Sequence, residues 1–98
     1  MVKYKLTTGA VKDLEDIWAY TYEKWSVEQA DRYYNLIIDE IEYLTSNPLA
    51  GKSMDHIKEG YRASKVKSHL VFYKISGDKP LEIVRILHQR MDVENRMK

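Results

Sequence analysis

The chain has 98 residues, of which 44% are hydrophobic and 32% charged, so it is long enough for one hydrophobic core but not two, and we expect a single globular domain over residues 1–98. It contains no cysteine and no apolar run near the ~18 residues of a membrane span, which excludes disulfides, cysteine-ligated metal sites and a thiol nucleophile and indicates a cytoplasmic protein without membrane contact. The net charge of +1 divides into −4 over residues 1–48 (5 Lys and Arg, 9 Asp and Glu) and +5 over residues 49–98 (11 Lys and Arg, 6 Asp and Glu).

Residues 2–6 alternate apolar and basic side chains, a pattern that predicts a short, half-buried strand. Thr7 or Thr8 can then cap a helix, because a threonine hydroxyl accepts hydrogen bonds from backbone N–H groups that the first helical turn leaves unpaired. An apolar stripe with helical spacing follows and consists of Leu14, Ile17, Trp18, Thr21 and Trp25. The sequence therefore predicts a first amphipathic helix, with its acidic residues on the solvated face.

A second helix is predicted from Ser26, where Gln29 completes a capping box. Its apolar stripe consists of Ala30, Tyr33, Tyr34, Ile37, Ile41 and Leu44. It should end before Asn47-Pro48, because proline disfavours helical geometry in the residue that precedes it. The connection between the two helices is so short that they must form an antiparallel hairpin.

Residues 49–60 have no apolar period and are interpreted as a loop. Three strands are predicted after it, over residues 61–66, 69–75 and 81–88, and their short connections require antiparallel neighbours. Strict alternation in the last strand places Val84, Ile86 and His88 on one face and Ile83, Arg85 and Leu87 on the other. Residues 89–98 are expected to form a turn and a short helix. The predicted fold class is α+β, in the order β-α-α-β-β-β, with an antiparallel helical hairpin packed on one face of a small, mostly antiparallel sheet.

Most catalytic and metal chemistry lacks its motif in this sequence. The four glycines are isolated, so there is no glycine-rich phosphate loop. His56, His69 and His88 do not have the spacing of metal ligands, and we expect neither a metal ion nor a cofactor.

The cations of the second half gather on the predicted strands or just after them, at Arg62, Lys65, Lys67, His69, Arg85, His88 and Arg90. One interpretation is a surface for a phosphodiester backbone, with a histidine as general acid or base in RNA cleavage. The other is that acidic helices and a basic sheet complement each other, with Arg85 paired to a helix carboxylate and His69 and His88 at strand ends. The residues alone leave both interpretations open.

The aromatic residues also divide into two groups. Trp18, Tyr33 and Tyr73 are interpreted as packing between the helices and the sheet. Tyr22, Trp25 and Tyr34 lie nearer the edges of the apolar stripes, where a tyrosine or tryptophan favours contact with a partner.

Several motifs occur in one order along almost the whole chain: Asp13-Leu14-x-x-Ile17-x-x-Tyr20, Ala30-x-x-Tyr33, Asn47-Pro48-x-x-Gly51, Arg62, His69-Leu70-Val71-Phe72-Tyr73, and the run from Ile83 to Asp92. The last is the most specific and reads IVRILHQRMD. Together they resemble the ParE toxins of the RelE/ParE superfamily of bacterial type II toxin–antitoxin systems, whose closing strand and His-x-Arg-Met-Asp ending are closely similar. The fold that this resemblance implies agrees with the predicted order of elements.

The resemblance implies a toxin without catalytic residues that inhibits DNA gyrase and blocks replication. It also implies a ParD-type antitoxin that neutralises the toxin in a hetero-oligomer and carries it to operator DNA. The residues expected to contact such partners are Tyr22, Trp25, Tyr34, Arg62, Lys65, Arg85, His88, Arg90 and Met91.

The alternative is the RelE branch of the superfamily, whose members cleave messenger RNA on the ribosome. In that case the catalytic residues would be Arg62, His69, His88 and Arg90. The residues after Asp92 include neither tyrosine nor histidine, unlike those of the ribonuclease members, and this departure favours the non-enzymatic toxin. A toxin that binds its antitoxin but has lost its toxicity is a third possibility.

Overall fold

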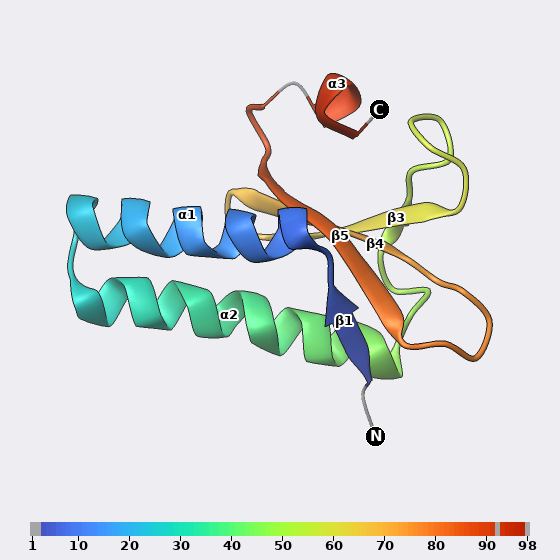
Figure 1. Cartoon of the computed structure of the whole chain (residues 1–98), viewed down its shortest axis with the longest axis horizontal. Coiled ribbons are helices and arrows are strands. Elements are labelled where there is room, and N and C mark those ends of the chain that lie inside the picture. Colours follow the sequence, from blue (N-terminus) through green and yellow to red (C-terminus); the bar gives the residue numbers. More distant parts are fainter. Residues whose placement is uncertain (1–2, 92, 98) are drawn as a thin grey trace.

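The computed structural model describes residues 3–91 and 93–97 of the chain. Two long helices, α1 (Thr8–Lys24) and α2 (Val27–Ser46), lie side by side as an antiparallel pair (Figure 1). The remaining elements are β1 (Tyr4–Leu6), β2 (Lys52–Ser53), β3 (Tyr61–Val66), β4 (His69–Lys74), β5 (Leu81–His88) and the short helix α3 (Val93–Met97). The strands form one sheet in the order β1-β5-β4-β3-β2, in which β1 runs parallel to β5 and the three other pairs are antiparallel. The predicted fold class is confirmed.

The predicted helix boundaries are also confirmed. The Thr7 hydroxyl accepts a hydrogen bond from the Ala10 N–H at 3.0 Å and thereby caps α1. The Ser26 hydroxyl accepts one from the Gln29 N–H at 3.1 Å and caps α2, which ends one residue before Asn47. Only one residue, Trp25, separates Lys24 at the end of α1 from the cap of α2, so the two helices fold back on each other.

The strand β2 was not predicted. It lies inside residues 49–60, which were interpreted as a loop, and pairs with Arg62 and Ala63 of β3. Two residues are too few to show the alternation of a strand, so this pairing leaves no signal in the sequence. The strand predicted over residues 69–75 ends at Lys74, and Val2 of the first predicted strand lies outside the described residues.

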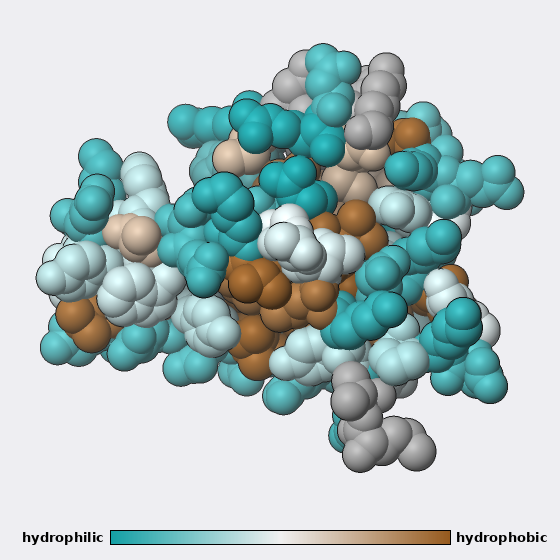
Figure 2. All heavy atoms as spheres, in the orientation of Figure 1, coloured by the Kyte–Doolittle hydropathy of each residue, from teal (hydrophilic) through white to brown (hydrophobic). Residues whose placement is uncertain are grey.

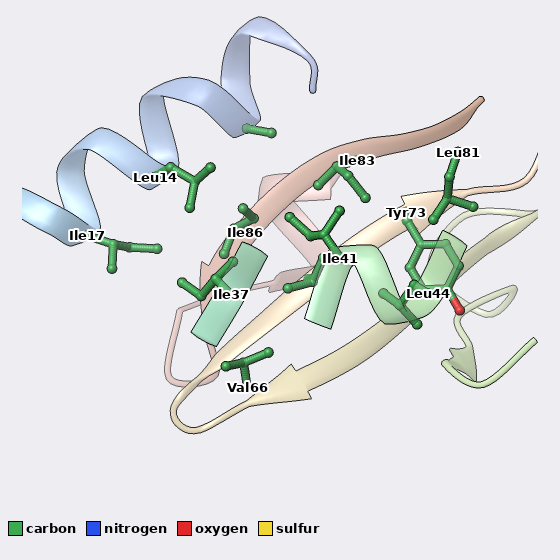
Figure 3. Packing of buried hydrophobic residues seen from close by; sticks show 12 residues of the cluster. Leu14, Ile17, Ile37, Ile41, Leu44, Val66, Tyr73, Leu81, Ile83 and Ile86 are labelled. Atoms are coloured by element: carbon green, nitrogen blue, oxygen red, sulfur yellow. The ribbon is translucent and has the colours of Figure 1, made fainter. Parts of the chain in front are cut away.

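Two hydrophobic clusters lie on opposite faces of the sheet. The larger cluster fills the space between the sheet and the helical hairpin, and Figure 3 shows side chains of α1 and α2 such as Leu14, Ile37 and Ile41 directed at the strands. The smaller cluster lies on the other face, where Phe72 and Leu87 pack with Met97 of α3. Figure 2 shows that apolar residues on the visible face gather where the hairpin meets the sheet, within a mostly hydrophilic surface.

The alternation predicted for the last strand is wrong, because β5 contains a β-bulge. Tyr73 pairs with Ile83 whereas its neighbour Phe72 pairs with Arg85, so Val84 is an extra residue on β5. The bulge shifts the alternation by one residue. As a result, Ile83 and Ile86 both belong to the larger cluster, and Val84 and Leu87 belong to the smaller one.

The carboxylate of Asp13 on α1 fastens the helix to this bulge. Its two oxygens accept hydrogen bonds from Nε of Arg85 at 2.7 Å and from Nη2 at 3.0 Å, and Oδ2 also accepts one from the Ile86 N–H at 2.9 Å. A bulge interrupts the ladder of backbone hydrogen bonds, and the carboxylate supplies a partner for the Ile86 N–H there. The hydrogen bonds to Asp13 raise the pKa of Arg85 above its usual value. The expectation that Arg85 pairs with a helix carboxylate is therefore confirmed.

We predict that Asp13→Asn lowers the free energy of unfolding by about 2–3 kcal/mol, because it removes the charge that holds a mostly buried guanidinium. Urea denaturation at pH 7 measures the change. The control is Asp16→Asn on the same helix, whose exposed carboxylate pairs with Lys12 at 3.5 Å and should contribute less than about 0.5 kcal/mol. Equal losses in the two variants would contradict this role for Asp13.

Candidate partner-binding groove

An open groove of about 770 Å³ runs between the helical hairpin and one end of the sheet. One wall consists of the second half of α1 and the first turns of α2. The other wall consists of the β3–β4 turn and the end of β5, and Figure 1 shows the end of β5 beside α1. We call it the aromatic groove. Its apolar and aromatic lining includes Ile17, Tyr20, Trp25, Tyr33 and Met91, and its cationic and imidazole side chains are Lys67, His69 and His88.

Local structure places these side chains at the groove. Trp25 is the residue that joins the two helices, and its side chain is 76% exposed. Lys67 occupies the tight β3–β4 turn with φ of 55°, a left-handed conformation that turns of this kind require. The Gln89 N–H donates to the Ser68 carbonyl at 2.8 Å, which holds the segment after β5 against that turn and brings Met91 to the rim.

Three ring side chains from three elements meet at the floor of the groove. The Tyr33 hydroxyl on α2 is hydrogen bonded to Nδ1 of His69 on β4 at 2.6 Å, and it lies 3.2 Å from the Val66 carbonyl. His69 and His88 are directly opposite each other on β4 and β5, and their rings meet edge to face at 5.2 Å. The Arg90 N–H donates to Nδ1 of His88 at 3.0 Å.

The surroundings of His69 favour its neutral form. Burial and, to a smaller extent, the neighbouring His88 together lower the pKa of His69 to about 4, although the carboxylate of Asp13 acts in the opposite direction. Burial also raises the pKa of Tyr33, against the effect of the Ser68 backbone N–H. At neutral pH the floor of the groove therefore offers His69 and Tyr33 as uncharged hydrogen-bonding groups.

Two of the predicted partner-binding cations are occupied by intramolecular contacts. Arg62 donates to the carbonyls of Leu49 and Gly51, at 3.0 Å to Leu49 and at 2.6 and 3.0 Å to Gly51. Arg85 is held by Asp13. These two guanidiniums fix a loop and a helix, whereas Lys65 and Arg90 are exposed. A role for Arg62 or Arg85 in partner binding stays a prediction, but both side chains have a structural role.

The structure does not bring the four predicted catalytic residues together. On the β3–β4 ladder, Arg62 is paired with Tyr73, whereas His69 is paired with Val66, four residues further along β3. Four strand residues span roughly 13 Å. Arg62 is therefore at the far end of the ladder from His69, His88 and Arg90.

The aromatic residues and the methionine that were predicted to contact a partner lie in different places. Trp25 and Met91 line the aromatic groove. Tyr22 is stacked on Trp18 of the same helix with ring centroids 5.4 Å apart, and the Trp18 indole links α1 to α2 by donating to Asp31 at 2.9 Å. Tyr34 is exposed on α2 and is not part of the groove lining.

Sequence reasoning missed three groove residues. Tyr33 was interpreted as packing only, Lys67 was one of many strand cations, and Tyr20 appeared only inside a motif. The spacing of Tyr20 from Ile17 is a helical signal that extends the apolar stripe toward Trp25. Nothing in the sequence indicates that Tyr33 and His69 meet, because they are 36 positions apart.

Within residues 3–91 and 93–97, no group of three or more histidine, cysteine or acidic side chains is arranged to hold a metal ion. In the same part of the chain, no helix combines the length and the apolar character that crossing a bilayer requires. What the groove offers is an apolar, aromatic surface with hydrogen-bonding groups at its floor and a cation on one wall. Such a surface suits a polypeptide segment with apolar side chains.

The chain is similar to known proteins along almost its whole length. The family model described as "ParE toxin of type II toxin-antitoxin system, parDE" matches residues 4–93. Toxin ParE1 of Mycobacterium tuberculosis strain H37Rv is 39% identical over 95 residues, which cover 97% of each chain. Toxin ParE1 of Caulobacter vibrioides is 38% identical over 92 residues and 94% of each chain, and Toxin ParE of Escherichia coli is 32% identical over 97 residues, or 99% of this chain and 94% of the relative.

A solved structure described as "Chromosomal ParDE TA system from P. aeruginosa" has the same fold. It superposes with a TM-score of 0.76 over 90% of this chain and 96% of that chain, at 24% sequence identity.

The low pKa of His69 predicts a specific loss of stability in acid. Between pH 6.5, the ordinary value, and about 4, the unfolded chain binds a proton at this imidazole that the folded chain does not. The free energy of unfolding should therefore fall as the pH decreases through this window, and this effect should be absent above it. Because the ring is partly exposed, we expect a screened contribution on the order of 1–2 kcal/mol.

Urea denaturation of the wild type and His69→Gln at pH 7 and pH 4 separates this effect from the titration of carboxylates, which both proteins share. The variant should lose less stability than the wild type. His56→Gln, at an exposed position of the 54–60 segment, should keep the wild-type dependence. An unchanged dependence in His69→Gln would contradict the assignment.

Proposed function

Because the chain belongs to the ParE toxin family of type II toxin–antitoxin systems, we propose that it acts by binding other macromolecules, a ParD-type antitoxin that neutralises it and the DNA gyrase that it inhibits. The family match confirms the resemblance seen in the run from Ile83 to Asp92, of which Asp92 itself lies outside the described residues. The chain is a toxin of a parDE system.

The aromatic groove is the observation that supports antitoxin binding. Trp25 and Tyr20 are 76% and 63% exposed, and large aromatic side chains of this kind commonly supply most of the affinity of an interface. A flexible antitoxin segment that folds on binding needs apolar pockets for its anchors and charges that fix its register. Lys65, Lys67 and Arg90, around the end of the groove, provide such charges for an acidic segment.

The complex is proposed to be a hetero-oligomer in the cytoplasm, in which the antitoxin supplies the contact with operator DNA. The similar solved structure is described as a ParDE TA system, and we extend that pairing to this chain by analogy. The toxin itself would then bind DNA only indirectly.

The division of the basic residues supports a non-enzymatic action on gyrase. Arg62 is engaged with the carbonyls of Leu49 and Gly51, far from the imidazoles of His69 and His88, so a cationic catalytic set is not assembled among the described residues. Arg90 is exposed in the segment between His88 and Met91, two residues of the groove lining, and is available to a protein target. Inhibition by contact requires only this kind of surface.

Ribosome-dependent cleavage of messenger RNA remains a second candidate, because of one observation. Tyr33, His69 and His88 lie in contact in an open groove, and imidazole and phenol groups can serve as general acids and bases. The experiments must therefore distinguish the two targets.

We predict that Trp25→Ala weakens binding of the full-length ParD-type antitoxin by roughly 10- to 100-fold, as loss of an aromatic anchor commonly does. Isothermal titration calorimetry measures the dissociation constant. The control is Tyr43→Ala on α2, which removes a 53% exposed aromatic side chain outside the groove and should change the constant by less than about twofold. Equal effects of the two variants would place the antitoxin elsewhere.

We predict that the purified toxin inhibits gyrase supercoiling and leaves messenger RNA intact on translating ribosomes. Arg90→Ala should keep the wild-type melting temperature and inhibit gyrase about tenfold less, because the exposed side chain supports no core contact. Arg32→Ala, which removes an exposed arginine on α2, is the matched control and should inhibit like the wild type. Cleaved transcripts with unaffected gyrase would reverse the choice of target.

A further inference from the structure

We propose that the aromatic groove contains a subsite for a single carboxylate of the bound antitoxin segment, formed by Lys67 and His88 where the β3–β4 turn meets the end of β5. This inference rests on the proposed function, because it assigns a chemical feature to the partner in that groove. It predicts that one acidic side chain of the partner, flanked by apolar anchors, fixes the register of the complex.

Lys67 in the β3–β4 turn and His88 at the end of β5 are brought close to each other by the pairing of β4 with β5. His88 is directly opposite His69 in the sheet, and the next residue, Gln89, donates its N–H to the carbonyl of Ser68 at 2.8 Å. Lys67 immediately precedes Ser68 in the turn. Both side chains belong to the lining of the groove.

The hydrogen bond to His88 fixes which atom it can offer a ligand. Nδ1 accepts the Arg90 N–H at 3.0 Å, so in the neutral imidazole the proton is on Nε2, which is then a hydrogen-bond donor. Over the described ranges 3–91 and 93–97, no protein group accepts a hydrogen bond from this nitrogen. An acceptor from the partner would complete its hydrogen bonding, and a metal ion would not fit, because Nε2 carries the proton.

Lys67 supplies the charge that makes a carboxylate the preferred acceptor. The exposed ammonium forms no ion pair within the part of the chain that the structure describes, in contrast to Arg85, which is held by Asp13. A donor beside an uncompensated cation binds an anionic oxygen more strongly than a neutral carbonyl. His69 adds no second positive charge, since its Nδ1 is engaged by Tyr33 and its pKa is lowered by burial.

The groove is electrostatically asymmetric, which favours a peptide carboxylate over a nucleic acid. Asp16 on α1 lines the opposite wall and is exposed beside Lys12. A phosphodiester backbone carries a charge on every nucleotide and would meet this carboxylate as well as the cation. A peptide can place one acidic side chain at Lys67 and apolar side chains against Trp25 and Tyr20.

A double-mutant cycle tests the subsite. The probe is a full-length ParD-type antitoxin, together with variants in which each of its acidic residues is changed singly to the amide. One of these should bind wild-type toxin roughly 10- to 100-fold more weakly, as expected for a hydrogen bond to a charged group, and should show little further loss on Lys67→Gln toxin.

Lys79→Gln, at an exposed lysine of the β4–β5 loop outside the groove lining, is the matched control and should leave that loss unchanged. His88→Phe keeps a ring and removes the Nε2 donor, and it should behave like Lys67→Gln. If His88→Phe does not fold, the comparison of Lys67→Gln with Lys79→Gln still tests the subsite, because both lysines are exposed and neither substitution disturbs the core.

Additive losses for every antitoxin variant, or equal behaviour of Lys67→Gln and Lys79→Gln, would overturn the subsite while leaving antitoxin binding intact. Displacement of the antitoxin by a 20-nucleotide single-stranded RNA, with a dependence on Lys67, would overturn it in favour of a nucleic-acid site. No binding of the antitoxin to wild-type toxin would overturn the proposed function as well.

Discussion

The carboxylate of Asp13 determines how the two layers of this protein fit together. It lies on α1 and accepts hydrogen bonds from Arg85 and Ile86, more than 70 positions away, at the point where the extra residue of β5 interrupts the ladder. The bulge in turn brings both Ile83 and Ile86 to the helix-facing side of the sheet. A single side chain therefore supports the strand irregularity, the packing of the hairpin and the position of the end of β5, which forms one wall of the groove.

The contact between Asp13 and Arg85 also accounts for part of the positive charge of residues 49–98. Its net charge of +5 suggests a uniform cationic surface, but Arg85 neutralises a helix carboxylate and Arg62 holds the loop that precedes β2. The interpretation that the acidic helices and the basic sheet complement each other is thus confirmed at Arg85, whereas a partner surface formed by the exposed cations stays a prediction. The exposed cations that border the groove, Lys65, Lys67 and Arg90, lie near the β3–β4 turn and after β5, and this end of the sheet is where an acidic partner is attracted.

The helices, their caps and the three long strands could be predicted from the sequence because their signals are local: apolar periods, a threonine and a serine at the helix starts, and short connections. The bulge at Val84 could not be predicted, since it depends on a carboxylate distant in sequence, and β2 is too short to have a period. For the site, Trp25, His88 and Met91 were among the predicted partner contacts. Lys67 and Tyr33 were not predicted as partner contacts, because they join the groove only through residues that are distant in sequence, and no local pattern indicates such neighbours.

The walls of the groove are held by contacts that do not depend on a partner. Thr21 bonds back to the Ile17 carbonyl within α1, Tyr33 is fixed by His69, and the segment after β5 is bonded to Ser68. Because this surface is already formed, the toxin loses little conformational entropy when a partner binds. Most of the entropic cost of binding then falls on the flexible partner. The side chains that remain free to rearrange are the exposed ones at the rim, such as Trp25 and Met91. Substitutions of these exposed rim residues should therefore change the choice of partner with little loss of stability, whereas loss of Asp13 should affect both the fold and the groove wall that it supports.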